Sequence, residues 1–288
     1  MRSSPVCCSV TGVRTATEIT RLGVLGWPVA HSRSPAMQNA ALAAAGLTHW
    51  RYQLLPAPPD VFAELVTGLP GAGFRGANVT IPHKEAALAL ATAPTERARA
   101  IGAANTLTFE PGKEIVADNT DAPALLAALP LTIAGHSALV LGAGGSARAA
   151  VWALLDAGAR EVRVWNRSAD RARQLGDELG AVALPAAPAA AALRSDVLIN
   201  CTSLGLDGSD PFDRLPVAAD DLVDYSCVVD LVYTAGGTAL VAAAQDRGVP
   251  VVDGLELLIG QGALSFERFT GRAAPVEAMR AAVRSGGV

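Results

Sequence analysis

Residues 137–156, SALVLGAGGSARAAVWALLD, join an apolar segment typical of a buried strand to a helical pattern through a glycine-rich turn. Gly142 permits the tight turn, and Gly144 lets a ligand approach the backbone. The first turn of a helix also offers unpaired N–H groups and the positive end of its dipole, and both attract phosphate. The segment therefore predicts the phosphate-binding turn of a dinucleotide site, to which Ser146 and Arg148 could add polar contacts. An ordinary strand-to-helix turn is the alternative.

Strand and helix patterns alternate regularly after this turn. Apolar strand segments recur at 161–165 (EVRVW), 196–200 (DVLIN) and 228–232 (VVDLV), and helical patterns separate them. Such an array forms a parallel sheet with helices on both faces, because each crossover connection places its helix over the sheet. We therefore predict a Rossmann-like, doubly wound nucleotide domain.

The residues that follow the second strand distinguish between two nicotinamide cofactors. An NAD site places a carboxylate here, where it binds the ribose hydroxyls. This chain instead has Asn166, Arg167 and Ser168, with Arg171 one helical turn further on. Two guanidinium groups and short polar side chains suit a 2′-phosphate dianion. The pattern favours NADP(H), and a solvated helix start with outward-facing arginines is the alternative.

The chain on either side of this domain forms a second α/β pattern. Between residues 21 and 121, short apolar segments alternate with helical ones, and the strands that flank Pro111-Gly112 predict a β-hairpin. Helical patterns at 254–271 and 275–283 have no strand after them and could return to cover the first domain. We therefore predict an α/β fold of two domains, with these boundaries: a flexible tail at 1–20, a substrate-binding domain at 21–121 plus 256–288, and an NADP-binding domain at 122–255.

Polar strings in the first half of the chain mark a candidate reaction site. They are HSRSP at 31–35, NVTIPHK at 78–84, and ANTL and ADNTD between 104 and 121, and each ends or follows an expected strand. Since ligand sites of open α/β sheets gather at the carboxyl ends of strands, these strings are expected to share one cleft.

Lys84 is the candidate catalytic residue in that cleft. Only two of the 23 basic residues are lysines, and lysine, unlike arginine, can release a proton and act as a general acid and base. Asp121 can hold the ammonium group in place. Asp121 or Thr120 is also expected to cap a helix that runs to Leu129. A solvated position on a surface helix is the alternative for Lys84.

Composition excludes several classes of protein. With 288 residues, 51% hydrophobic and 17% charged, the chain can bury the cores of two domains. A net charge of −4 gives no basic field for nucleic acid or an anionic membrane, and no apolar run reaches the ~20 residues that span a bilayer. The four cysteines lack metal-ligand spacing. We expect a cytoplasmic monomer or homodimer that binds a small molecule and no metal.

Nine segments, taken in order, closely resemble shikimate dehydrogenases. They extend from Arg21 to about Gly271 and read GVLGWPVAHSRSPAMQNAAL, GANVTIPHKEAAL, IGAANTL, ADNTD, VLGAGGSARAA, NRS, NCTSLGL, VVDLVY and DGLELLIGQGALSFERFTG. Each segment alone is weak evidence for a family, but nine such segments in sequence order are a specific match. The resemblance implies reversible NADPH-dependent reduction of 3-dehydroshikimate to shikimate, a step of chorismate and aromatic amino-acid biosynthesis.

The resemblance also implies roles for individual residues. Lys84 and Asp121 would form the catalytic pair. The residues that would bind substrate are Ser32, Ser34, Thr80, Asn105, Tyr233 and Gln261, with the two serines and Tyr233 at its carboxylate. The residues that would bind the cofactor are Gly142, Ala143, Gly144, Gly145, Ser146, Asn166, Arg167, Ser168, Arg171, Thr202, Leu231, Gly254 and Leu257.

Three positions depart from the family pattern. Gln38 stands where the family usually has His, Ala122-Pro123 follows Asp121 in place of the common Gly, and Thr-Ala-Gly-Gly follows Tyr233 in place of a Pro-containing loop. Three rival functions stay open: a quinate or dual quinate/shikimate dehydrogenase, a non-catalytic ligand sensor of the same fold, and a folate-dependent dehydrogenase of similar two-domain form. The intact pair of Lys84 and Asp121 counts against the sensor.

Overall fold

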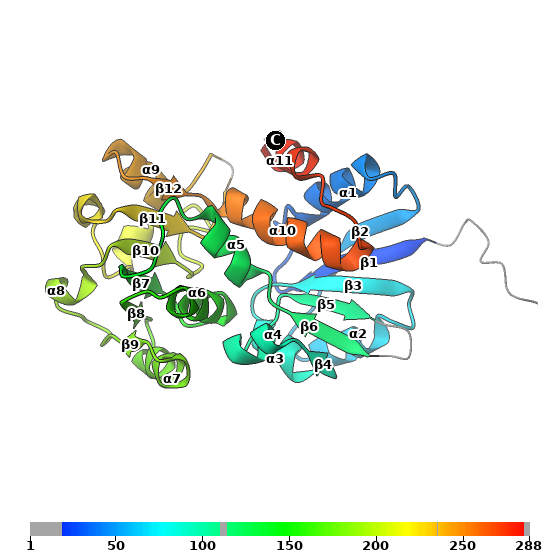
Figure 1. Cartoon of the computed structure of the whole chain (residues 1–288), viewed down its shortest axis with the longest axis horizontal. Coiled ribbons are helices and arrows are strands. Elements are labelled where there is room, and N and C mark those ends of the chain that lie inside the picture. Colours follow the sequence, from blue (N-terminus) through cyan, green and yellow to red (C-terminus); the bar gives the residue numbers. More distant parts are fainter. Residues whose placement is uncertain (1–18, 110–113, 235, 285–288) are drawn as a thin grey trace, which may run out of the picture.

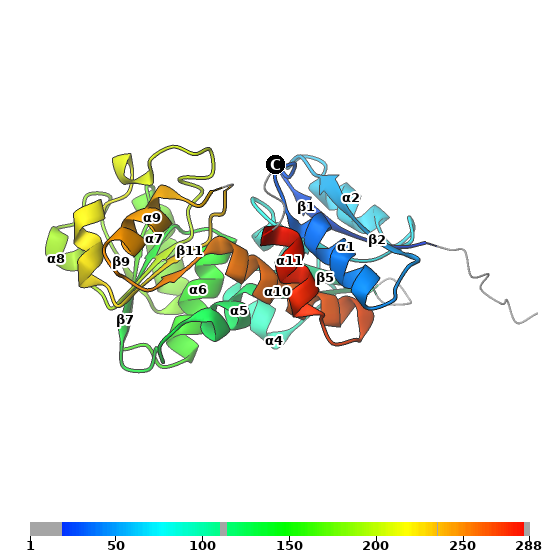
Figure 2. The same ribbon diagram turned by 90° about the horizontal axis from the view of Figure 1, so that it is seen from above.

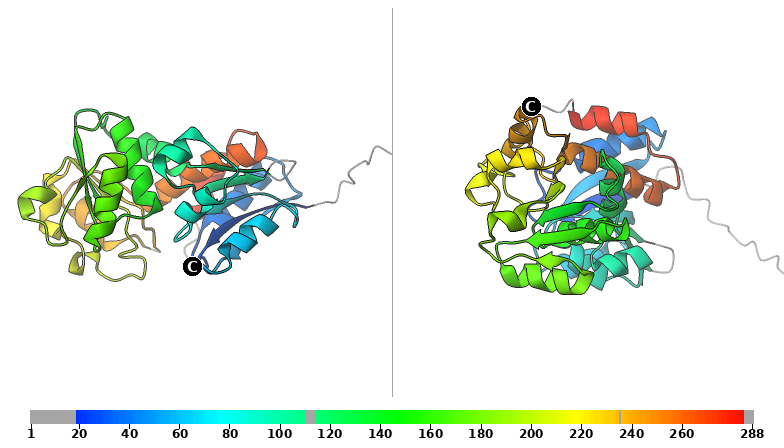
Figure 3. Two further views of the ribbon diagram at one scale, coloured as in Figure 1. Left: turned by 90° about the horizontal axis from the view of Figure 1, so that it is seen from below. Right: turned by 60° about the vertical axis from the view of Figure 1, so that its left-hand side comes forward.

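The computed structural model describes residues 19–109, 114–234 and 236–284, and in these residues the strands form two six-stranded sheets. The sheets lie in two lobes side by side (Figure 1), and Figure 3 shows the same lobes from below and from one side. No helix in the described part of the chain has the length and apolar character needed to cross a membrane.

The first sheet has the order β2-β1-β3-β5-β6-β4. Its strands are β1 (Thr20–Gly26), β2 (Trp50–Pro56), β3 (Phe74–Val79), β4 (Ala93–Pro94), β5 (Thr106–Phe109) and β6 (Ile115–Asp118). β1, β2 and β3 are parallel, whereas β5 runs antiparallel to both β3 and β6. The strands of the predicted hairpin therefore pair, and Pro111-Gly112 lies outside the described residues. Of the tail predicted at 1–20, residues 1–18 also lie outside them, and Thr20 begins β1.

The C-terminal helices return to this first lobe, as predicted. The helices of the lobe are α1 (Ser34–Ala44), α2 (Phe62–Gly68), α3 (Lys84–Ala89), α4 (Glu96–Ile101), α10 (Gly254–Thr270) and α11 (Val276–Arg284). α10 and α11 pack on α1 (Figure 2). Phe266 and Phe269 of α10 and Met279 of α11 are buried there against Leu22 and Met37, so the return of the chain completes the core of the first lobe.

Polar contacts attach α11 to two neighbouring helices, α10 and α1. Arg280 and Arg284 pair with Glu256 in the first turn of α10. The backbone carbonyl of Val283 accepts a hydrogen bond from the guanidinium of Arg33 at 2.7 Å, and Arg33 directly precedes α1. α11 therefore joins the start of α10 to the start of α1.

The second sheet is parallel throughout and has the order β12-β11-β10-β7-β8-β9. Its strands are β7 (Ser137–Leu141), β8 (Glu161–Trp165), β9 (Val182–Ala183), β10 (Val197–Asn200), β11 (Cys227–Asp230) and β12 (Val251–Val252). The helices of this part of the chain are α5 (Asp121–Ala128), α6 (Gly145–Asp156), α7 (Ala169–Leu179), α8 (Ala190–Leu193) and α9 (Ala239–Asp246), with 3-10 turns η1 (Pro211–Asp213) and η2 (Ala219–Asp224).

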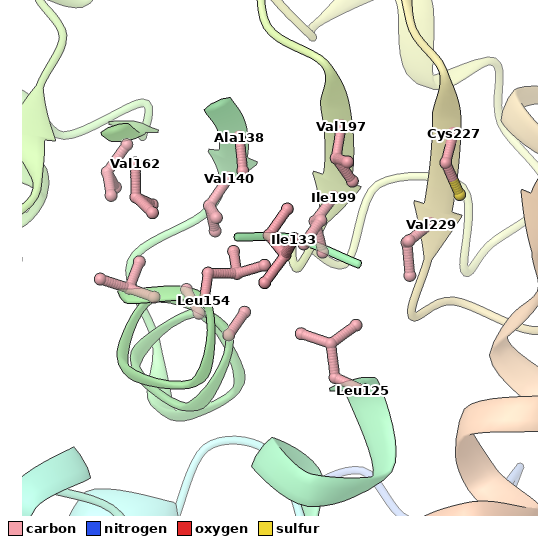
Figure 4. Packing of buried hydrophobic residues seen from close by; sticks show 14 of the residues in the cluster. Leu125, Ile133, Ala138, Val140, Leu154, Val162, Val197, Ile199, Cys227 and Val229 are labelled. Atoms are coloured by element: carbon pink, nitrogen blue, oxygen red, sulfur yellow. The ribbon is translucent and has the colours of Figure 1, made fainter. Parts of the chain in front are cut away.

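Both faces of the second sheet are buried. Val140 and Ile199 face one core, which Leu125 of α5 and Leu154 of α6 complete (Figure 4). Leu139, the neighbour of Val140, belongs to a separate core, because successive residues of a strand point to opposite faces. Burial on both faces explains why β7, β10 and β11 are nearly continuous apolar runs, whereas β8 alternates buried residues with half-buried Glu161 and Arg163. The predicted Rossmann-like domain is confirmed.

The start of α5 is capped by a different side chain from the one expected. Thr120 stands at the N-cap without a capping hydrogen bond from its hydroxyl, which is instead bonded to the Asn105 side chain. The side-chain oxygen of Asn119 accepts the backbone N–H groups of Asp121 and Ala122 at 3.1 and 3.2 Å. Asp121 is therefore the first residue of the helix, with its backbone fixed from the preceding loop.

Arg148 of α6 links the two lobes. Its Nε donates to the carbonyl oxygen of Ile101, the last residue of α4, at 2.8 Å, and its Nη2 pairs with Glu178 of α7 at 2.6 Å. The side chain is buried in these contacts. This differs from the expected polar contact with a dinucleotide, because α6 turns Arg148 toward the first lobe instead of toward the glycine turn.

Asp230 is a buried carboxylic acid at the end of β11. Its Oδ1 accepts hydrogen bonds from the Asn200 side chain and the Val232 N–H, and its Oδ2 accepts one from the Thr238 hydroxyl. Burial raises the pKa of Asp230 to about 6, although these hydrogen bonds favour the ionised form. The group ties β10, β11 and the start of α9 together.

Replacing Asp230 by Asn should change how stability depends on pH. An unfolded aspartate ionises near pH ~4, whereas folded Asp230 keeps its proton up to about pH 6. The wild type should therefore lose stability relative to Asp230→Asn as the pH rises from ~4 to ~6, by about 3 kcal/mol. Urea unfolding followed by circular dichroism measures the difference, with the exposed Asp177→Asn as control. A constant difference between wild type and Asp230→Asn over this range would contradict the assignment.

Candidate active site

The polar strings of the first half of the chain meet in a cavity of about 180 Å³, lined from both lobes. The predicted catalytic pair and all the predicted substrate-binding residues line it: Ser32, Ser34, Thr80, Lys84, Asn105, Asp121, Tyr233 and Gln261. Pockets for drug-sized ligands measure ~300–1,000 Å³, so this smaller cavity suits a small molecule.

Lys84 and Asp121 form an ion pair in this cavity. The Lys84 Nζ lies 2.6 Å from the Asp121 Oδ2, and Lys84 is 9% exposed. The other carboxylate oxygen accepts a hydrogen bond from the amide of Asn105 at 2.7 Å. Asp121 also stands at the positive end of α5, where a carboxylate is stabilised. The ammonium group is therefore held by a carboxylate that is itself anchored.

A buried network of hydrogen bonds fixes the amide of Asn105. Its Oδ1 accepts from the backbone N–H of Thr120 at 2.8 Å and from the hydroxyl of Thr106 at 3.0 Å. The hydroxyl of Thr106 lies 2.9 Å from that of Ser265 on α10, which also accepts from the Asn78 amide at 2.8 Å. Thr106 belongs to the ANTL string that the sequence places in the cleft, whereas Ser265 lies within a helical pattern in which no signal marks it.

Hydroxyl groups of Ser32, Ser34 and Tyr233 also line the cavity. The backbone N–H of Ser34 donates to the Ser32 Oγ at 3.3 Å. Burial raises the pKa of Tyr233, although hydrogen bonds with the Arg33 backbone and Ser32 partly offset it. Tyr233 is therefore a neutral hydroxyl near pH 7 and can donate a hydrogen bond to an anion.

A second groove follows the glycine turn and is continuous with the cavity, since Cys201, Thr202 and Ser203 line both. The predicted cofactor residues that line the groove are Gly142, Ala143, Gly144, Asn166, Arg167, Ser168, Arg171 and Thr202. The predicted cofactor residues that line the first cavity are Ser146, Thr202, Leu231, Gly254 and Leu257. Gly145 lines neither of them.

The glycine turn fits the phosphates of a dinucleotide. Gly142 has a φ of +112°, and a Cβ atom there would lie 3.1 Å from the carbonyl oxygen of Cys201. A Cβ atom on Gly144 would meet nothing within 4 Å, so it would project into the groove and obstruct a ligand that approaches the backbone. The turn leads directly into α6, whose first N–H groups lack intrahelical partners.

Arg214 is a third arginine of this groove, beside Arg167 and Arg171. It follows the 3-10 turn η1 and lies in the long connection between β10 and β11. That connection has no period in its sequence, so its path over the groove depends on tertiary packing. No signal in the sequence identifies Arg214.

Gly145 packs against the stem of Lys84. A Cβ atom on Gly145 would lie 2.5 Å from the Lys84 Cβ and 3.1 Å from its Cδ. The glycine turn of one lobe and the catalytic candidate of the other are therefore in direct contact.

Family models match three parts of the chain. They are the shikimate dehydrogenase substrate binding domain at residues 24–107, shikimate/quinate 5-dehydrogenase at 126–205, and the shikimate 5′-dehydrogenase C-terminal domain at 254–284. A protein of Methylobacterium radiotolerans named shikimate dehydrogenase (NADP(+)) is 46% identical over 270 residues, which cover 87% of this chain and 91% of that protein. The chain belongs to the shikimate dehydrogenase family. A Paracoccus denitrificans protein of the same name is 45% identical and covers 88% of this chain and 92% of its own length.

Solved structures of shikimate dehydrogenases share this fold. The enzyme from Aquifex aeolicus is 33% identical with a TM-score of 0.83, covering 92% of this chain and 98% of that one. The enzyme from Thermus thermophilus, in complex with NADP(H) and shikimate, is 38% identical with a TM-score of 0.80, covering 93% and 99%. A 5-ketofructose reductase of a Gluconobacter strain is 29% identical with a TM-score of 0.77, covering 93% and 99%, so the fold also carries a protein named for another ketone.

Replacing Gly145 by Ala should destabilise this shikimate dehydrogenase family member. The added methyl group would overlap the Lys84 Cβ, which is fixed to the backbone of α3, so α3 and α6 would have to separate. We expect a loss of about 1–3 kcal/mol, as for other overpacked contacts, measured by urea unfolding. Gly144→Ala is the matched control, because its Cβ meets nothing within 4 Å. Equal losses for both variants would contradict the contact.

Proposed function

We propose that this chain catalyses the reversible NADPH-dependent reduction of 3-dehydroshikimate to shikimate, a step of chorismate and aromatic amino-acid biosynthesis. The observation that carries the proposal is the ion pair of Lys84 and Asp121, 2.6 Å apart in a cavity that opens into a dinucleotide groove. Membership in the family supports the same reaction, since relatives named shikimate dehydrogenase (NADP(+)) match over most of the chain.

Lys84 is the proton donor of the proposed reaction. NADPH, when bound, supplies the hydride that reduces the substrate ketone. The carbonyl oxygen becomes an alkoxide as the hydride arrives, and the ammonium of Lys84 gives it a proton. Asp121 holds the ammonium in place. In the reverse direction the neutral amine of Lys84 takes the proton of the hydroxyl.

Hydrogen bonds to the ring and the carboxylate would orient the substrate. Thr80, Asn105 and Gln261, whose side chains carry hydroxyl and amide groups, line the cavity, which suits the hydroxyls of a polyol. Ser32, Ser34 and Tyr233 would bind the carboxylate. A neutral Tyr233 supports this role, because it donates a hydrogen bond to an anion instead of repelling it.

We propose that the two domains bind different ligands. Residues 21–121 with 256–288 would bind the substrate, with Tyr233 added from the other domain, and residues 122–255 would bind NADP(H). Separate family models for the substrate binding domain and for residues 126–205 support the division.

The proposed location of the protein is the reducing cytoplasm. Two described cysteines, Cys201 and Cys227, are free thiols, which supports that location. We propose a monomer or a homodimer as the working form.

The proposed reaction can be tested through the two lysines of the chain. Nicotinamide absorbance should rise when the wild type meets shikimate and NADP. Lys84→Ala should lower kcat by about 10²–10⁴-fold, the usual contribution of a general acid. Lys113→Ala, which removes the other lysine, should keep the rate. The same assay with quinate and with NAD separates a shikimate enzyme from a quinate or dual enzyme. Turnover of neither acid by the wild type would overturn the proposal.

Replacing Arg167 by Ala should affect NADPH far more than NADH. Arg167 follows the second strand of the nucleotide sheet and lines the groove with Arg171, so its guanidinium would pair with the 2′-phosphate. Loss of a charge-assisted hydrogen bond of ~1.5–3 kcal/mol should raise KM for NADPH about 10- to 100-fold. Steady-state kinetics with both nucleotides measure the ratio. An equal rise for NADPH and NADH would count against the 2′-phosphate contact.

A further inference from the structure

The ammonium of Lys84 has a second partner, which comes from the opposite lobe. The Lys84 Nζ donates to the Ser146 Oγ at 2.8 Å, in addition to the Asp121 Oδ2 at 2.6 Å. Ser146 is the second residue of α6, directly after the glycine turn. The family resemblance makes Ser146 a cofactor contact, but its hydroxyl oxygen already accepts a hydrogen bond from Lys84.

These two contacts leave one hydrogen-bond direction of the ammonium available. An ammonium group has three N–H donors and no acceptor. Asp121 takes the first and Ser146 the second. Because the three N–H bonds are tetrahedrally arranged, fixing two directions also fixes the third. Lys84, Asp121 and Ser146 all line the cavity, so the third N–H is left for a ligand there.

The stem of Lys84 is held by the same turn as its ammonium. Gly145 packs on the Cβ, Cγ and Cδ atoms of Lys84, and the next residue, Ser146, binds the Nζ. With Asp121 on the other side, Lys84 is restrained along its whole length. A freely rotating ammonium would lose this orientation without losing its charge.

We propose that Ser146 is a positioning residue for Lys84. Its hydroxyl, together with the Asp121 carboxylate, restricts rotation of the ammonium and directs the remaining N–H toward the oxygen that receives the proton. This role rests on the proposed reaction, in which Lys84 is the proton donor. It differs from a cofactor contact, because removal of the hydroxyl should impair proton transfer and leave the affinity for NADPH unchanged.

Ser146→Ala and Ser146→Thr separate positioning from cofactor binding. We expect Ser146→Ala to lower kcat about tenfold, the effect of losing one hydrogen bond to a charged group. Ser146→Thr keeps a hydroxyl and should restore kcat to within about twofold of the wild type. The Kd for NADPH, measured by fluorescence titration, should stay within about twofold in both variants. Ser226→Ala, at an exposed serine of the same lobe, is the control.

NMR of the lysine side chains gives a readout that is independent of turnover. Labelling with ¹⁵N-lysine produces two Nζ signals, because Lys84 and Lys113 are the only lysines of the sequence, and Lys113→Arg assigns them. In the protein without ligands, hydrogen exchange at the Lys84 Nζ should become several-fold faster in Ser146→Ala, since the ammonium loses one acceptor. Ser146→Thr should return it to the wild-type rate.

The outcomes distinguish this proposal from the proposed function. An unchanged kcat for Ser146→Ala in an active enzyme overturns the positioning role, and so does an unchanged exchange rate at Lys84. A rise in the Kd for NADPH, with kcat at saturating NADPH unchanged, makes Ser146 a cofactor contact only and also overturns it. A wild type that turns over neither acid defeats the proposed function, whereas the exchange measurement still tests the contact of Ser146 with Lys84.

Discussion

The close approach of α6 to the first lobe is the constraint on which the site depends. One lobe carries the glycine turn and the other carries Lys84, so a reaction between a bound dinucleotide and a substrate requires the lobes to meet within a few ångströms. Gly145 permits this approach, because any larger residue would overlap the Lys84 stem. One helical turn further on, Arg148 bonds to the carbonyl of Ile101 at the end of α4. Two contacts one turn apart set both the distance and the rotation of α6 against the first lobe.

Most of the nucleotide lobe could be predicted from the sequence, because its strands are buried on both faces and follow each other with regular helices between them. The polar strings of the cavity could be predicted for a related reason: each follows a strand, and strand ends converge in this class of fold. The sequence does not specify how a helix is rotated against another domain. Arg148 follows the glycine turn and therefore resembles a phosphate contact, yet its side chain joins the lobes. Arg214 lies in a connection without sequence periodicity. No local pattern therefore predicts that Arg214 lies in the same groove as Arg167.

The polar residues behind the ion pair form hydrogen bonds with one another. These hydrogen bonds make this part of the site rigid. Asn78, Asn105, Thr106 and Ser265 are buried and bond in a connected group. A buried polar group without a partner is costly, so each member restricts the orientation of the next. The amide of Asn105 is thereby oriented toward Asp121 before any ligand arrives. Such preorganisation is what an active site needs when charge develops on a reacting oxygen.

The attachment of α11 has a consequence for how the sequence can diverge. No described residue of α11 lines the cavity or the groove, and a helix with that position would ordinarily accept substitutions freely. Its arginines, however, hold Glu256 next to Leu257, and its backbone holds Arg33 between the two cavity serines. Both walls of the site are thus fastened to a helix outside it. Replacing Arg280 or Arg284 should therefore disturb both walls of the site, although neither arginine lines the cavity or the groove.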